Sequence, residues 1–245
     1  MALSNLKYTL IIPCFNSEKW IQQCIESAIA QTYENCDIVV VDNESTDSSL
    51  QIAQKYEDRV IVSTAKNLYK YSYQEPVEKA LSLSHGDYFT ILGSDDYVDP
   101  QYIEKINNIV SVNPEKVKFL QTPIVGVQAD TGTFVGEISH KYKSLDEFKQ
   151  LLFKHSPVNT PTMVFKRSLY DSGVVRWKSE EYLGAIDYDL YFNLADKGYF
   201  IFAFPRWIGY YYRWHKDQAT WGMHKENTNY DQKIKDHWRK KWTPA

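Results

Sequence analysis

Two adjacent carboxylates, Asp95 and Asp96, follow an apolar run at residues 88–92, with only Gly93 and Ser94 between. A short β-prone run bounded by turn residues predicts a buried strand. In an open parallel sheet, ligands bind beyond the carboxyl ends of the strands. Neighbouring carboxylates repel each other unless a cation or proton lies between them, and Mg²⁺ or Mn²⁺ is commonly shared with substrate phosphates. The pair therefore predicts a metal–diphosphate site. The alternative is that both residues, with Asp99, favour the N-terminus of the next helix.

The first hundred residues alternate between strand and helix patterns. Strands are predicted at residues 8–12 (ended by Pro13), 37–41, 60–63 and 88–92. Helices are predicted from Glu18 (capped by Ser17) to Ile29, after residue 47 to about 56, and at 75–83. This alternation predicts right-handed βαβ units and a mostly parallel sheet flanked by helices, an α/β fold.

The pattern changes after a helix predicted at residues 100–112. Segments 117–127 and 133–138, separated by Asp130-Thr131-Gly132, predict a β-hairpin. Ser144 is expected to cap a helix that runs to about 153, and a further helix is expected at 187–197. Strands are predicted at 163–166, 199–204 and 207–213, and a helix in the tail. We expect a single domain over residues 1–245, divided into 1–113, 114–222 and a helical tail, 223–245.

Composition excludes several classes of protein. With 28 Lys and Arg against 31 Asp and Glu, the net charge of −3 argues against a nucleic-acid binder. Three cysteines without metal-ligand spacing predict small buried side chains in a reducing compartment. No run approaches the ~18 apolar residues of a membrane span, and the N-terminus does not read as a signal peptide, so we expect a cytoplasmic protein. The basic, aromatic tail fits either a packed helix, which we favour, or one lying on the inner face of a membrane.

Five stretches, in order, resemble the inverting glycosyltransferases of family 2, which have the GT-A fold. They are Ile11 to Asn16 with Gln31-Thr32-Tyr33, Val39 to Asp47, Gly86 to Asp96, Ile186 to Leu190 with Lys197-Gly198-Tyr199, and Tyr211 to His215. The resemblance implies a sugar transferred with inversion from a nucleoside diphosphate, most commonly UDP, to a hydroxyl of a saccharide or lipid-linked saccharide. It also implies a divalent cation, Mn²⁺ or Mg²⁺. Residues 1–113 would bind the nucleotide sugar and 114–222 the acceptor.

Asp42, at the end of the second strand, can accept hydrogen bonds from a nucleobase imide or from ribose, although a helix-capping role also explains it. The resemblance extends the donor site to its neighbours and assigns the other roles. It implies that metal ligands are Asp96 and His215 and that the general base is Asp187. Acceptor contacts are expected from Asn159, Thr160 and Thr162. Donor contacts are expected from the largest group, namely Pro13, Cys14, Phe15, Asn16, Asp42, Asn43, Ser45, Asp95 and Arg213. Asp187 also suits the N-cap of the helix that follows it.

The chain departs from the family pattern at two carboxylate positions and in one basic pair. Gly93 stands where the first acidic residue of the metal motif is usual, and Ile186 replaces the Glu that commonly precedes the base. The Arg-Asn pair common before Gly86 is absent. Two alternatives stay open: a non-catalytic nucleotide-sugar or glycan-binding module, and a nucleotidyltransferase. The second would need a Gly-rich phosphate loop, which residues 13–16 do not form.

Overall fold

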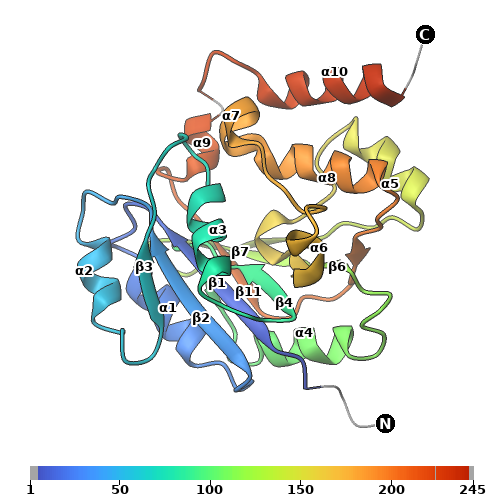
Figure 1. Cartoon of the computed structure of the whole chain (residues 1–245). Coiled ribbons are helices and arrows are strands. Elements are labelled where there is room, and N and C mark those ends of the chain that lie inside the picture. Colours follow the sequence, from blue (N-terminus) through green and yellow to red (C-terminus); the bar gives the residue numbers. More distant parts are fainter. Residues whose placement is uncertain (1–4, 224, 243–245) are drawn as a thin grey trace.

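The computed structural model describes residues 5–223 and 225–242. A seven-stranded sheet runs through the centre of the molecule (Figure 1). Its strands, in the spatial order β10-β6-β9-β4-β1-β2-β3, are β10 (Phe202–Ala203), β6 (Phe119–Gln121), β9 (Val164–Lys166), β4 (Tyr88–Ile91), β1 (Tyr8–Cys14), β2 (Cys36–Asp42) and β3 (Ile61–Thr64). Strand β9 is antiparallel to β4 and β6, whereas the other pairs are parallel.

A second sheet of four strands lies beside the carboxyl end of β4. Its order is β5-β11-β7-β8, with β5 at Tyr97–Val98, β11 at Tyr210–Trp214, β7 at Ile124–Gln128 and β8 at Phe134–Ile138. Strands β7 and β8 form the predicted hairpin. Strand β5, which the sequence pattern did not indicate, is only two residues long and pairs with β11 directly after the carboxylate pair.

Helices cover both faces of the central sheet, because its strands carry apolar side chains on both faces. Val39 and Val41 of β2 pack into one core cluster and Val40 into the other, the two-residue alternation of a strand. The helices are α1 (Ile21–Ile29), α2 (Ser49–Gln54), α3 (Gln74–Ser82), α4 (Tyr102–Val110), α5 (Leu145–Leu152), α6 (Arg167–Asp171), α7 (Ser179–Tyr182), α8 (Ile186–Asp196), α9 (Ala219–Met223) and α10 (Tyr230–Trp242), with short 3-10 turns at Thr160–Thr162 and Leu183–Ala185. The predicted α/β architecture, with its antiparallel addition and C-terminal helix, is confirmed.

Three local predictions were wrong. Residues 117–127 do not form one strand, because the segment breaks at Thr122-Pro123 and its halves, β6 and β7, join different sheets. Strand β1 continues through Pro13 to Cys14, because the β1–β4 ladder has already ended and no backbone donor is needed on that side. Ser17 does not cap α1, since its hydroxyl bonds Phe15 and Ser94 and the helix begins at Ile21.

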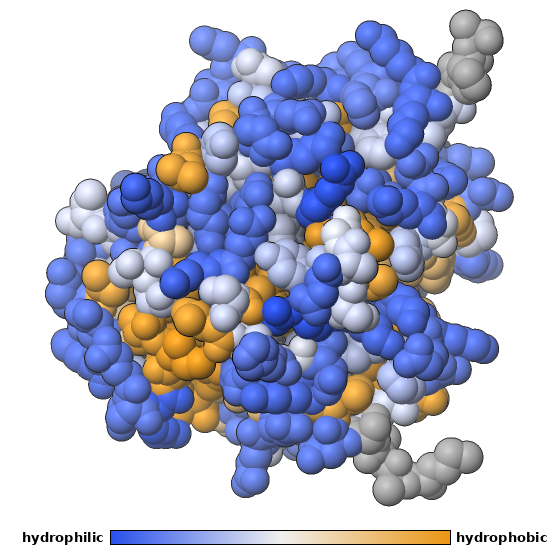
Figure 2. All heavy atoms as spheres, viewed as in Figure 1, coloured by the Kyte–Doolittle hydropathy of each residue, from blue (hydrophilic) through white to orange (hydrophobic). Residues whose placement is uncertain are grey.

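Helix α10 packs along α8 (Figure 1), as the packed-helix alternative expected. Ile234 and Trp238 are buried, the Trp238 indole donates to Asp189 of α8 at 2.8 Å, and the Trp242 indole donates to Asp196 at 2.8 Å. The surface over α10 is hydrophilic (Figure 2). Its apolar side chains therefore face the protein. Among the described residues, no helix is both long and apolar enough to cross a bilayer.

Candidate functional site

The loops after β1 and β2 are joined by hydrogen bonds at adjacent strand ends. Asp42 Oδ2 accepts from the Ser45 N–H at 3.0 Å, Ser45 Oγ accepts from the Asn16 N–H at 3.0 Å, and Asn16 Oδ1 accepts from the Thr46 N–H at 2.8 Å. Asn16 adopts a left-handed backbone with φ of 48°, a conformation that Asn tolerates. The buried Asp42 Oδ1 and Asn43 Oδ1 have no partner among the described residues. Because buried acceptors are costly to leave unpaired, these two oxygens suit a ligand that donates.

The remaining predicted donor residues of this edge differ in exposure. Cys14 is buried, and burial raises the pKa of its thiol to about 12, so it contributes packing and no charge. Phe15 is 48% exposed and offers a ring surface at the rim. Asp47, which ends the second of the resembling stretches, hydrogen-bonds within the protein, because its carboxylate accepts from the Glu18 N–H at 3.0 Å and from the Ser49 hydroxyl at 2.6 Å.

Asp95 and Asp96 are neighbours in sequence but differ in their surroundings. Asp96 is buried, with Oδ2 accepting from the Tyr210 hydroxyl at 2.7 Å and Oδ1 from the Arg213 N–H at 2.8 Å. Burial, with the adjacent Asp95 carboxylate, raises the pKa of Asp96 well above its ordinary value. Asp95 is partly exposed, and its Oδ2 lies 2.9 Å from Nε2 of His215. Both oxygens of Asp96 are therefore occupied, whereas Oδ1 of Asp95 has no hydrogen-bond partner within the described chain.

Strand β11 supplies both partners of the Asp96 carboxylate, and His215, which follows the strand, is the partner of Asp95. Arg213 lies behind the pair, between the rings of Trp20 and Tyr97, 5.1 and 4.7 Å from their centroids. Its guanidinium donates to the Asp95 carbonyl at 2.5 Å and to Gln23. In this arrangement Arg213 anchors the carboxylate turn from within the protein, and its contact with a phosphate stays a prediction.

The residues at this turn fit a divalent cation that is shared with a phosphate ligand. No cluster of three acidic, histidine or cysteine ligands occurs in residues 5–223 and 225–242, but Mg²⁺ is often held by one or two carboxylates plus substrate phosphates. Asp95, with Oδ1 free, is the accessible candidate ligand. The His215 side chain is 12% exposed, its Nε2 pairs with Asp95, and its buried Nδ1 has no partner among the described residues. Ligation by Asp96 and His215 stays a prediction. A Cβ added at Gly93 would lie 2.9 Å from Asp95 Oδ1 and from Asp96 Oδ2, so the missing side chain leaves room beside both carboxylates.

Asp187 lies at the start of α8, next to the predicted acceptor residues. Its Oδ2 accepts from the Thr160 hydroxyl at 2.6 Å, and Thr160 accepts in turn from the Tyr191 hydroxyl at 2.8 Å. Burial raises the pKa of Asp187, whereas the Thr160 hydrogen bond lowers it. Asn159 bonds the Thr122 and Ile138 carbonyls, both at 2.9 Å, and the fully buried Thr162 bonds Thr122. Of the three acceptor candidates, Asn159 and Thr160 reach open space and Thr162 does not.

One cleft of about 510 Å³ joins the Asp95–Asp96 turn to Asp187, and we call it the central cleft. Among the predicted residues, its wall includes Pro13, Asp95, Asp96, Asn159, Thr160 and Asp187. The other predicted site residues are not on this wall, namely Cys14, Phe15, Asn16, Asp42, Asn43, Ser45, Thr162, Arg213 and His215. The wall also contains side chains that sequence reasoning missed, namely Tyr71, Tyr73, Tyr210, Tyr212, Trp214, Met223 and Asp231. The abundance of Tyr and Trp was a signal for the five aromatic residues, two of which lie in the stretch Tyr211 to His215, and the sequence held no signal for Met223 or Asp231.

Tyr71 shows how such residues reach the cleft. Tyr71 has a left-handed backbone with φ of 65°. Its side chain packs directly on Gly184 and Gly222, because a Cβ added at either glycine would lie 2.7 Å from the nearest Tyr71 side-chain atom. These contacts join segments more than a hundred residues apart, so no local pattern could indicate them.

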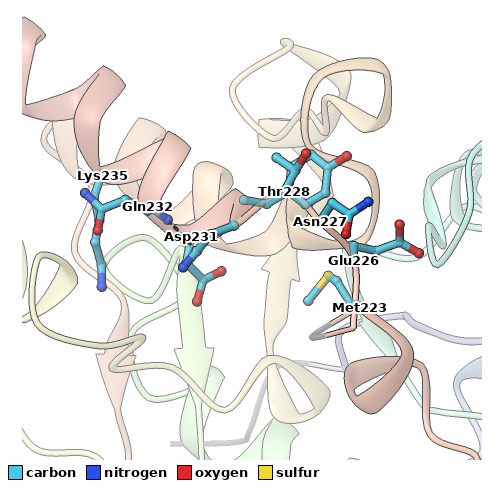
Figure 3. Close-up of a pocket in the computed structure, with 9 residues that line it drawn as sticks. Met223, Glu226, Asn227, Thr228, Asp231, Gln232 and Lys235 are labelled. Atoms are coloured by element: carbon cyan, nitrogen blue, oxygen red, sulfur yellow. Dashed lines mark hydrogen bonds between the residues drawn. The ribbon is translucent and has the colours of Figure 1, made fainter.

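A second pocket of about 410 Å³ adjoins the central cleft between α9 and α10 (Figure 3). We call it the interhelix pocket. It is lined by Met223, Glu226, Asn227, Thr228, Asn229, Tyr230, Asp231, Gln232 and Lys235. Met223 and Asp231 line both hollows.

The fold and the carboxylate-lined cleft define the class: an α/β protein of the GT-A type. The model of the family "Glycosyl transferase family 2" matches residues 9–173. The chain therefore belongs to glycosyltransferase family 2 and is a glycosyltransferase.

Two curated relatives agree with this membership. An uncharacterized glycosyltransferase of Haemophilus influenzae is 26% identical over 239 residues, which cover 93% of this chain and 71% of that protein. The WfaP protein of Escherichia coli, a UDP-Glc:α-D-GlcNAc-diphosphoundecaprenol β-1,3-glucosyltransferase, is 29% identical over 193 residues, which cover 78% of this chain and 70% of that protein.

Two solved structures share the fold. Residues 1–349 of Staphylococcus aureus TarS in complex with UDP-GlcNAc give a TM-score of 0.69 at 19% identity, covering 91% of this chain and 62% of that one. The mannosyltransferase PcManGT of Pyrobaculum calidifontis in complex with GDP-Man and Mn²⁺ gives 0.61 at 16% identity, covering 98% and 71%. This chain is thus similar to part of longer enzymes.

Proposed function

We propose that this glycosyltransferase moves a sugar from a UDP-linked donor to a hydroxyl of a saccharide acceptor, with inversion and with the help of a divalent cation. The observation that carries the proposal is that the Asp95–Asp96 turn and Asp187 line the same cleft. A donor diphosphate held at the turn would present its sugar toward Asp187.

The donor end of the proposal rests on the joined loops after β1 and β2. The unpaired oxygens of Asp42 and Asn43 suit the imide N–H of a uracil or the hydroxyls of ribose. The WfaP relative and the TarS complex carry UDP-linked sugars in their names, which supports UDP, whereas the PcManGT complex contains GDP-Man.

Asp95 and His215 are the proposed ligands of the cation, Mn²⁺ or Mg²⁺, and the Mn²⁺ complex of PcManGT supports its use. Bound there, the cation would offset the negative charge that develops on the leaving diphosphate. The chain's own part is positional: Arg213 holds the backbone carbonyl of Asp95, and Tyr210 holds Asp96.

Asp187 is the proposed general base. The acceptor oxygen attacks the anomeric carbon while its proton passes to the Asp187 carboxylate, and the carbon–oxygen bond to the diphosphate breaks with its electron pair leaving on UDP. A single displacement of this kind inverts the anomeric centre. The raised pKa of Asp187 suits a base that must take a proton near neutral pH. Thr160 orients the carboxylate.

We further propose that residues 1–113 bind the donor, 114–222 complete the acceptor side, and the tail, 223–245, supports α8. The name of the WfaP relative makes a lipid-linked saccharide a reasonable acceptor. Contact with the inner face of a membrane, in a cytoplasmic enzyme, would then use the basic face of α10, because its Trp238 pairs with Asp189 inside the protein.

The test is a titration with UDP in the presence and absence of Mn²⁺, combined with a screen of nucleotide sugars for release of UDP. We expect metal-dependent UDP binding and slow hydrolysis of one UDP-sugar. Binding of another nucleotide in preference to UDP would overturn the donor assignment, and binding unaffected by Mn²⁺ or by chelation would overturn the metal assignment.

A further inference from the structure

We propose that the interhelix pocket is a second sugar subsite, which binds the next unit of an oligosaccharide acceptor whose terminal unit lies at Asp187. This inference rests on the proposed function of the central cleft and extends it to the length of the acceptor.

The first support is adjacency. Met223 and Asp231 line both the interhelix pocket and the central cleft, so the two hollows meet at these side chains. The Asp231 carboxylate is near enough to Asp187 that its charge helps to raise the pKa of Asp187. A ligand that brings a hydroxyl to Asp187 can therefore extend past Asp231 into the pocket.

The second support is the chemistry of the lining. Figure 3 shows Met223, Glu226 and Asn227 on one side and Asp231, Gln232 and Lys235 on the other. Amide and hydroxyl groups that both donate and accept match the hydroxyls of a carbohydrate. The thioether of Met223 offers an apolar contact for the C–H face of a sugar ring.

The third support is charge. Glu226 pairs with Lys70 at 2.5 Å, so its carboxylate is already neutralised. The remaining charges of the pocket are Asp231 and Lys235, one of each sign. A phosphate would meet a carboxylate here as well as an ammonium group, so the pocket favours a neutral, hydroxyl-rich ligand.

The fourth support is the availability of partners. Asn229 caps α10, its Oδ1 accepting from the Gln232 N–H at 3.0 Å, and Gln232 donates to Asp236 at 2.7 Å. By contrast, neither the Asn227 nor the Thr228 side chain hydrogen-bonds another residue in the described part of the chain. These two side chains are free to bind a saccharide.

The test uses methionine methyl signals, because Met223 lines the pocket whereas Met163 is fully buried in the core. The protein is labelled with ¹³C-methyl methionine, with UDP and Mn²⁺ present, and titrated with glucose, galactose, N-acetylglucosamine and their β-linked disaccharides. We expect a disaccharide to shift the Met223 signal at a lower concentration than its monosaccharide does, while the Met163 signal stays in place.

The variant Asn227→Ala/Thr228→Ala should weaken binding of that disaccharide about tenfold, since two hydrogen bonds are lost. Asn108→Ala, on exposed α4 surface far from both hollows, should leave it unchanged. No Met223 shift with any saccharide, or equal affinity in the double variant and wild type, would overturn the subsite. Donor hydrolysis by the wild-type protein is measured alongside. Its presence, with equal disaccharide affinity in the double variant and the wild type, refutes the subsite alone, and its absence counts against the proposed function.

Discussion

The predicted donor loops and the Asp187 side of the central cleft are built differently. The loops after β1 and β2 are fixed by hydrogen bonds within a few residues of each strand end, such as Ser45 to Asp42. At the acceptor end, Asp187 is oriented by Thr160, and the surrounding wall comes from segments near residues 71, 184 and 223. Under the proposed function, nucleotide recognition would be carried by the sheet itself, whereas acceptor recognition would be assembled from distant parts of the chain.

The largest effect is expected for a substitution of Asp187, which should slow the transfer step without weakening nucleotide binding. Asp187→Asn should lower kcat roughly 10²–10⁴-fold, because an amide cannot take the proton of the acceptor hydroxyl. The dissociation constant for UDP with Mn²⁺ should not change. Both are measured by UDP release and by calorimetry, with Asp130→Asn, an exposed hairpin residue, as the matched control. Transfer at the wild-type rate would rule out Asp187 as the base.

The second prediction concerns the buried member of the carboxylate pair. Asp96→Ala leaves the Tyr210 hydroxyl and the Arg213 N–H without acceptors, which should lower the free energy of unfolding by roughly 1–3 kcal/mol for each group. We also expect metal-dependent UDP binding to be lost. Denaturant titration measures the first effect, and Tyr210→Phe, which removes one of the two hydrogen bonds, should cost less. An unchanged unfolding midpoint for Asp96→Ala would contradict this account.

The third prediction concerns the accessible member. Asp95→Ala should weaken UDP binding in Mn²⁺ by about 10-fold or more, while the free energy of unfolding stays near that of the wild type, since the side chain is partly exposed. Calorimetry with Mn²⁺ and with a chelator separates the metal-dependent part. If the loss were equal under both conditions, Asp95 would contact the nucleotide directly and not through the cation.

The smallest expected effect is a shift in the pH dependence of kcat/KM. Burial raises the pKa of Asp187, so kcat/KM should fall as the pH drops through that raised value and the base becomes protonated. The Thr160 hydrogen bond stabilises the ionised carboxylate and opposes this rise. Thr160→Ala should therefore move the acid limb of the profile to higher pH, as measured by initial rates across buffers. A shift to lower pH would show that Thr160 does not stabilise the carboxylate.

The contrast between locally fixed strand ends and a wall built from distant segments explains how much of the fold and the site the sequence could predict. Strand ends carry local signals, so the positions of Asp42 and of the Asp95–Asp96 turn followed from the apolar runs before them, and the α/β fold followed from their alternation. The break at Thr122-Pro123 was missed because both halves are apolar and only tertiary pairing assigns them to different sheets. Tyr71 was missed because its place depends on Gly184 and Gly222. The difference between Asp95 and Asp96 depends on Tyr210, which lies more than a hundred residues away.

Strand β11 has a consequence for how the enzyme tolerates change. Tyr210 and Arg213 of this strand both donate to Asp96, the first through its hydroxyl and the second through its backbone N–H, and His215, directly after the strand, lies beside Asp95. Sliding this ribbon by a single position would turn every one of these side chains to the opposite face. Insertions or deletions in the preceding segment, around residues 204–209, should therefore disrupt the Asp95–Asp96 turn as thoroughly as replacing the aspartates, although they alter no acidic residue.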